Sequence, residues 1–127
     1  MEIKLASVMV DDQDKALKFY TEVLGFVKKT EIPMGNFKRL TVVSAEGPAD
    51  VELVLEPNEN PAAKVFQKAL YDQGIAATAF AVDDIQSEFA RLKKLGAHFK
   101  TEPTKIGPAT IAVLDDTCGN LIQIYQV

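Results

Sequence analysis

The chain has 127 residues, is 47% hydrophobic and carries a net charge of −4, which suits one compact domain and is too short for two ordinary ones. The net charge is negative and no stripe of lysine or arginine is present, so the sequence lacks the positively charged surface that nucleic-acid binding needs. No apolar run approaches the roughly 20 residues of a membrane-crossing helix, and we expect no leader before the first strand-like segment. The single cysteine excludes an intramolecular disulfide. We therefore expect a cytoplasmic protein that binds neither nucleic acid nor membrane.

The first 57 residues predict the element order β-α-β-β-β. An aspartate precedes the helical segment as its N-cap, and Gly25 follows it, where a left-handed conformation ends a helix. Turn-forming residues separate the strands. The predicted strands are 3–10, 26–32, 37–44 and 51–55, and the predicted helix is 13–24.

Residues 58–74 form a polar break followed by a helix that starts at Pro61 and ends before Gly74. The remaining residues, 75–127, predict the β-α-β-β-β order a second time. The predicted strands are 76–82, 97–101, 110–114 and 121–126, and the predicted helix is 85–95.

These two halves repeat one another about 72 residues apart: Val10-Asp11-Asp12 returns as Val82-Asp83-Asp84, and Leu24-Gly25 returns as Leu95-Gly96. Half a chain of this length cannot bury a core alone. The sequence therefore predicts one domain over residues 1–127, of the α+β class. Two paired βαβββ modules, 1–57 and 75–127, joined by the helical connector 58–74, would form a cleft where their sheets meet.

The acidic residues after the first strand allow two interpretations. Clustered carboxylates such as Asp11, Asp12 and Asp14 are the ligands that hard cations prefer. The repeat of the pair as Asp83-Asp84, again between a strand and a helix, favours helix capping, in which a side-chain oxygen accepts hydrogen bonds from free backbone N–H groups.

Two other side chains that could carry chemistry, His98 and Cys118, are expected to have no catalytic or metal-binding role. His98 is the only histidine, so a multi-histidine metal site is excluded, and its place beside apolar residues at the start of a strand predicts a solvated edge residue. Cys118 lies beside two aspartates, whose charge disfavours the thiolate, and we expect it to be a turn residue.

Glu52 and Gln123 are more promising, because each stands within an apolar strand, at what looks like the same position in its module. Alternation places Glu52 with Val54 on one face of the sheet and Gln123 with Tyr125 on the corresponding face. That face is either exposed to solvent or lines a cavity.

The stretch from Val10 to Phe26 is similar to the V-x-D-x-x-K-A-x-x-F-Y-x-x-x-L-G-F signature of the vicinal oxygen chelate superfamily, and the closing segment 115–124 resembles its D-P-D-G-N-x-I-E-L end. That superfamily includes glyoxalase I, the bleomycin-resistance proteins and the extradiol dioxygenases. The resemblance covers essentially the whole chain and implies the βαβββ repeat fold. It implies little about function, because one scaffold hosts many activities.

The resemblance also implies where a metal would bind: one residue on the first strand and one on the last strand of each module. The first-strand positions fall on Leu5 and Ala77, which cannot ligate a metal, and the last-strand positions fall on Glu52 and Gln123. We therefore expect no metal and no other cofactor. Glu52 would serve as a hydrogen-bond acceptor, or as a catalytic general base if burial raises its pKa.

Without a metal, the inward residues of the first strands become a wall of small and apolar side chains, which suits an organic ligand oriented by a few polar groups. The expected function is binding, and sequestration, of a small organic molecule by a homodimer. The alternative is a glyoxalase-like lyase, isomerase or dioxygenase relative that uses Glu52 as base, with or without a divalent metal, and a third reading is an interaction module with a closed cleft. The expected ligand-binding residues are Leu5, Ser7, Met9, Glu52, Ala77, Ala79, Gln123 and Tyr125.

Overall fold

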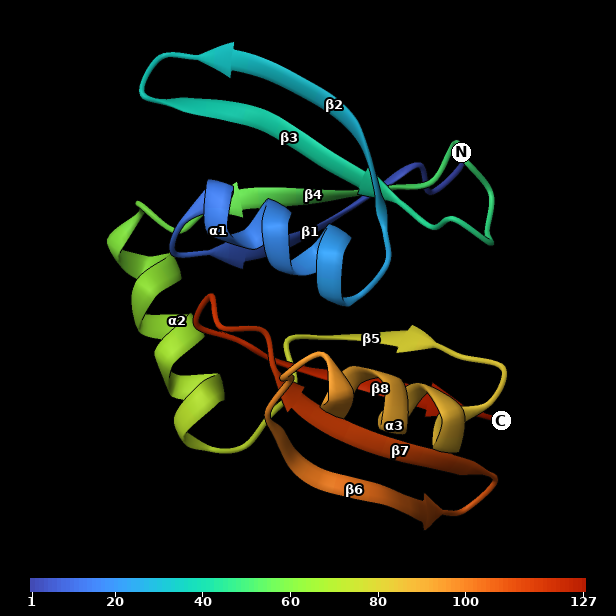
Figure 1. The fold of residues 1–127 in the computed structure, drawn as a ribbon. Coiled ribbons are helices and arrows are strands. Elements are labelled where there is room, and N and C mark those ends of the chain that lie inside the picture. Colours follow the sequence, from blue (N-terminus) through green and yellow to red (C-terminus); the bar gives the residue numbers. More distant parts are fainter. The chain divides into compact units, whose positions relative to one another are not determined.

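The computed structural model describes all 127 residues, which divide into two compact units, Met1–Val65 and Phe66–Val127. Each unit contains a four-stranded sheet with a helix on one face (Figure 1). The boundary falls inside helix α2 (Pro61–Asp72), which is the predicted connector helix. None of the helices has the length and apolar character that crossing a membrane requires.

The first unit has the strand order β1-β4-β3-β2, in which β1 runs parallel to β4 and the other pairs are antiparallel. Its helix continues without a break from an α-helical part into a π-helical turn, η1. The elements are β1 (Leu5–Val10), α1 (Gln13–Lys18), η1 (Phe19–Val23), β2 (Val27–Met34), β3 (Phe37–Val43) and β4 (Glu52–Pro57).

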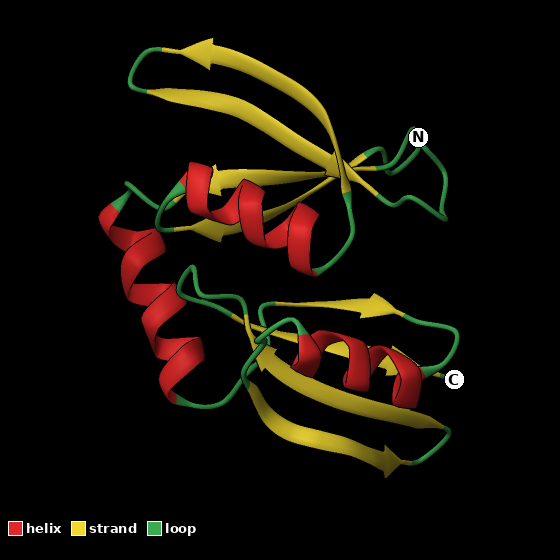
Figure 2. Ribbon diagram, viewed as in Figure 1, coloured by secondary structure: helices red, strands yellow, loops and turns green.

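The second unit repeats this plan with the order β5-β8-β7-β6 and a parallel pair between β5 and β8 (Figure 2). The elements are β5 (Thr78–Ala81), α3 (Ile85–Lys94), β6 (Phe99–Ile106), β7 (Ala109–Asp115) and β8 (Leu121–Gln126). The predicted α+β class and βαβββ repeat are confirmed. The largest differences are that β6 extends five residues beyond its predicted end at 101, and that a π-helical turn ends the first helix.

The paired aspartates cap helices, as the repeat predicted. The carboxylate of Asp12 accepts a hydrogen bond from the Lys15 amide at 3.0 Å, and that of Asp84 accepts one from the Ser87 amide at 3.1 Å and another from the Ser87 hydroxyl at 3.0 Å. These bonds hold the pKa of Asp84 below its ordinary value. Asp11 instead forms an ion pair with Lys15 at 3.1 Å.

Each sheet buries one face beneath its own helix, because alternate side chains of a strand point to opposite faces. In the first unit, Val8, Val10, Leu40, Val42 and Leu55 are buried on that face. In the second unit the corresponding buried side chains are Ala112, Leu114, Ile122 and Ile124, with Ile85 and Leu92 from α3. The other face of each sheet carries no helix of its own unit.

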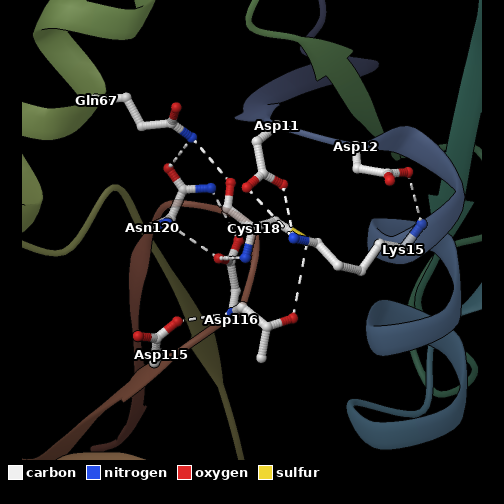
Figure 3. A network of polar contacts seen from close by, with 9 residues as sticks. Asp11, Asp12, Lys15, Gln67, Asp115, Asp116, Cys118 and Asn120 are labelled. Atoms are coloured by element: carbon white, nitrogen blue, oxygen red, sulfur yellow. Dashed lines mark hydrogen bonds and ion pairs between the residues drawn. The ribbon is translucent and has the colours of Figure 1, made fainter.

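The turn between β7 and β8 is built around a buried carboxylate (Figure 3). Asp116 is fully buried and accepts hydrogen bonds from the amides of Cys118 and Asn120, at 2.7 and 3.0 Å, and from the Asn120 side chain at 2.8 Å. Gln67 of α2 donates to the Cys118 carbonyl at 3.2 Å and to the Asn120 side chain at 3.1 Å. Cys118 is thus a buried turn residue, as predicted, and His98 is exposed just before β6.

We predict that Asp12→Ala and Asp84→Ala each lower the free energy of unfolding by ~1 kcal/mol, because each leaves a helix N-terminus without its acceptor. Denaturant melts measure the loss. Asp83→Ala removes the same charge next to a cap without removing a cap, so it should change stability far less. Equal losses in all three variants would contradict capping as the role of the acidic pairs.

We predict that Gly119→Ala is destabilising by roughly 1–3 kcal/mol. Gly119 has a positive φ of 98°, and a Cβ there would lie 2.8 Å from Nε2 of the buried Gln67 side chain. Gly107→Ala provides the comparison, because its φ is also positive, at 60°, but a Cβ meets nothing within 4 Å. Thermal or denaturant melts should show the larger loss for Gly119→Ala; equal losses would mean that backbone strain, and not the contact with Gln67, sets the cost.

Candidate functional site

The open face of the first sheet exposes a set of large apolar side chains. Monomeric proteins rarely leave such a set uncovered on one face unless it binds something. Strand alternation and the pairing register place them on the face opposite α1. They are Leu5 and Met9 from β1, Ile32 and Met34 from β2, and Phe37 from β3, with exposed fractions of 39 to 60%.

Glu52 lies on this face at the start of β4, and its carboxylate is held by neighbouring strands. The Thr41 hydroxyl donates to Oε1 at 2.7 Å, and the Thr30 hydroxyl lies 3.4 Å from the same oxygen. Thr41 is itself fixed, because its oxygen accepts the Thr30 amide at 3.1 Å and the residue is only 1% exposed. The Lys29 ammonium lies 3.9 Å from Oε2.

A β-bulge explains why two consecutive residues of β2 reach Glu52. Lys28 pairs with Val42 and Thr30 pairs with Thr41, so Lys29 is the extra residue between two successive rungs of the ladder. The bulge places Thr30 opposite Thr41 on the open face and leaves the Lys29 ammonium within ion-pair distance of Glu52.

These contacts decide the acidity of Glu52. The hydrogen bond from Thr41 lowers the pKa of the carboxyl group; partial burial opposes the shift, and the charge of Lys29 and the Thr30 hydroxyl add to it. The net shift of the Glu52 pKa is downward, because the effect of burial is outweighed, so the raised pKa that a general base needs is not found. The group is an ionised hydrogen-bond acceptor at neutral pH and a weaker base than an ordinary glutamate.

Gln123 occupies a different environment in the second sheet. It pairs with Ala79 of β5 and Val113 of β7, and its half-buried side-chain amide has no hydrogen-bond partner in the chain. Tyr125 and Ala81, two residues further along their strands, form the next pair on the same face. The amide is therefore free to bind a polar group from elsewhere.

The strand pairings show that Glu52 and Gln123 do not occupy equivalent positions in the two sheets, contrary to the prediction. Ser7 and Ala79 lie three residues before Val10 and Val82, yet Ser7 pairs with Val54 whereas Ala79 pairs with Gln123. Gln123 thus corresponds to Val54, two residues beyond Glu52. The preceding connections also differ in length, with eight residues between β3 and β4 and five between β7 and β8.

The donor set does not fit the divalent metal that the resemblance implies. Leu5 stands directly opposite Glu52 and offers no donor atom, and Ala77 precedes β5, where its amide bonds the Leu121 carbonyl at 2.8 Å. The chain contains no group of three or more His, Cys, Asp or Glu side chains that could hold a metal ion. Glu52 already accepts a hydrogen bond from Thr41 and faces the Lys29 ammonium, so its carboxylate is engaged within the chain.

The expected ligand-binding residues are thus distributed over two sheets. Leu5, Ser7, Met9 and Glu52 share the open face of the first sheet, and Ala79, Gln123 and Tyr125 share that of the second, with Ala77 just before β5. Sequence reasoning missed Thr41, Thr30 and Lys29. Alternation along residues 37–44 could have placed Thr41 on this face, whereas the bulge at Lys29 leaves no signal in the sequence.

Comparison with known proteins agrees with this architecture. Residues 2–124 match the family model described as the Glyoxalase/Bleomycin resistance protein/Dioxygenase superfamily. The uncharacterized protein YurT of Bacillus subtilis (strain 168) is 58% identical over 126 residues, which is 99% of each chain.

Two solved structures show the same fold. The crystal structure of UcmS2 superposes with a TM-score of 0.84 at 29% identity, over 98% of this chain and 97% of that one. TnmS3, an antibiotic binding protein from Streptomyces sp. CB03234, superposes with a TM-score of 0.75 at 26% identity, over 99% of this chain and 95% of that one. The family match over nearly the whole sequence, together with the βαβββ repeat, shows that the chain belongs to the Glyoxalase/Bleomycin resistance protein/Dioxygenase superfamily.

Proposed function

We propose that this protein binds and sequesters a small organic molecule. The observation that carries the proposal is the open sheet face of the first unit, where exposed apolar side chains share the face with the ionised carboxylate of Glu52. Ligand sites are typically apolar with a few placed polar groups. The likeness to TnmS3, an antibiotic binding protein, supports the same class of function.

The polar groups favour binding over chemistry. Glu52 has a lowered pKa and its Oε1 already accepts the Thr41 hydroxyl, so it offers Oε2 as an acceptor and is poorly suited to remove a proton from carbon. The Gln123 amide can both donate and accept. In this proposal Glu52 offers its carboxylate to a ligand on the open face of the first sheet, Gln123 offers its amide on that of the second, and apolar side chains supply most of the binding free energy.

We also propose that the protein acts in the cytoplasm as a homodimer. The lone Cys118 is a buried thiol, which suits a reducing compartment. Light scattering coupled to size-exclusion chromatography tests the assembly, because a mass near 28 kDa, twice the 13.9 kDa of one chain, is expected. A monomer mass at all concentrations would remove the dimer from the proposal.

We predict that purified protein, after mild dialysis, holds well under one equivalent of zinc, nickel, iron or manganese, because Leu5 and Ala77 occupy two of the four ligand positions that the family uses. Elemental analysis measures it. A ratio near one metal per chain that is lost in Glu52→Ala would overturn the metal-free proposal and favour the alternative, a glyoxalase-like enzyme.

We predict that Ala79→Phe abolishes ligand binding while changing the free energy of unfolding by no more than about 0.5 kcal/mol. Ala79 is an exposed, small residue beside Gln123, so a ring there covers the amide without overpacking a core. The measurement is a thermal-shift screen of antibiotics and related apolar compounds, followed by calorimetric titration of a hit.

Ala90→Phe is the matched control, because Ala90 is an exposed residue of α3, the helix on the opposite face of the second sheet. It should leave both stability and binding unchanged. If Ala79→Phe bound the hit as tightly as the wild type, the second sheet would have no part in binding. If the hit compounds were instead consumed, with product appearing at a rate that falls in Glu52→Gln, the enzyme alternative would replace sequestration.

A further inference from the structure

Two adjacent lysines of β2 have entirely different partners. The Lys28 ammonium bonds Glu31 at 2.9 Å, and Glu31 in turn pairs with Lys38 at 2.9 Å. Glu31 pairs with Leu40, a buried residue on the helix-covered face, so this ion network lies on the side away from Glu52. Lys29, displaced by the bulge, is the lysine that approaches the open face.

Lys29 is held in place at a second point. Its ammonium donates a hydrogen bond to the Ala49 carbonyl at 2.7 Å, in the loop between β3 and β4, while it lies 3.9 Å from Oε2 of Glu52. The Lys29 side chain remains 41% exposed and that of Glu52 21% exposed, so both charges can act on a molecule bound to this face. The Ala49 bond positions the ammonium without neutralising it, because a carbonyl carries no net charge.

The contacts of Glu52 divide its two oxygens. Oε1 accepts the Thr41 and Thr30 hydroxyls, whereas Oε2 accepts no hydrogen bond and lies 3.9 Å from the Lys29 ammonium. A ligand can therefore donate to Oε2. A ligand that brings a positive charge to the same place must also approach the Lys29 ammonium, which repels it.

We propose that Lys29 is a specificity-determining residue that cancels the charge of Glu52, so that the open face of the first sheet selects uncharged ligands bearing a hydrogen-bond donor over organic cations. The inference rests on the proposed ligand-binding function and names its ligand class: an apolar, uncharged molecule with a hydroxyl or N–H group. In this chain a fixed ammonium takes the place beside Glu52 that a bound cation would occupy, and a positively charged compound is a poor competitor for it.

The test uses three naphthyl probes that differ mainly in charge: 1-naphthol, naphthalene-1-sulfonate and trimethyl(1-naphthyl)ammonium. Each is titrated into the full-length protein and followed by fluorescence. In the wild type, 1-naphthol should bind more tightly than the cation. In Lys29→Met, the affinity for the cation relative to 1-naphthol should rise about fivefold, the upper end for a partly exposed charge pair, and the relative affinity for the sulfonate should fall.

Lys28→Met is the matched control, because it makes the same change in net charge at the neighbouring residue but breaks the pair with Glu31 instead. The ratio of affinities in this control should stay within about twofold of the wild type, and Lys29→Arg, which keeps the charge, should behave similarly. Melting curves of all three variants establish that they are folded.

The outcomes separate the two proposals. If the probes bind but Lys29→Met leaves the preference unchanged, or if Lys28→Met changes it equally, Lys29 does not determine specificity, although the face still binds organic molecules. If none of the three probes binds the wild type or any variant at millimolar concentration, the proposed function fails, and the inference about Lys29 fails with it.

Discussion

The burial of one face of each sheet beneath its own helix is the constraint on which the rest of this structure depends. Residues such as Val10, Leu40 and Leu55 are fully buried beneath α1, and Leu114 and Ile122 are fully buried in the second unit. Because strand residues alternate between faces, fixing these side chains also fixes which residues face the other way. Glu52 and Gln123 are on open faces for that reason and not because of a local preference.

The helix caps position the helices that bury one face of each sheet. Asp12 and Asp84 end the turns that follow β1 and β5, and each begins the helix that covers the sheet. A buried glutamine strengthens the arrangement in the first unit: Gln13 donates to the carbonyls of Lys38 and Leu55, at 2.7 and 2.9 Å, and so fastens α1 to β3 and β4. These contacts hold α1 on the sheet whose open face carries Glu52.

The two units share one fold, but their open sheet faces present different polar groups because their backbones differ locally. In the first unit a bulge brings Lys29 to Glu52, and neighbouring threonines hold the carboxylate. In the second unit the polar position lies two residues further along the last strand, so that Gln123 stands between Ala79 and Val113. The first sheet therefore presents a carboxylate with an ammonium beside it, and the second sheet presents an amide without a hydrogen-bond partner.

The sequence by itself determined the elements, their order and the caps of this protein, because these depend on residues close together in the chain. The alternation of residues 3–10, the aspartates before each helix and Gly25 after the first are all local signals. The repeat of Val-Asp-Asp then predicted two modules, and the alternation of apolar residues around Glu52 and Gln123 singled out these two polar residues on the second face of each sheet.

Only the tertiary structure decided what those residues can do. The pKa of Glu52 depends on Thr41, Thr30 and Lys29, which belong to other strands. The bulge that places Lys29 is a local change in strand pairing, and strand pairing depends on more than the residues next to Lys29 in the sequence. The same is true of the register that matches Gln123 with Val54 instead of Glu52: the number of residues in a loop is visible in the sequence, but the rung at which a strand re-enters the ladder is set by packing across the sheet.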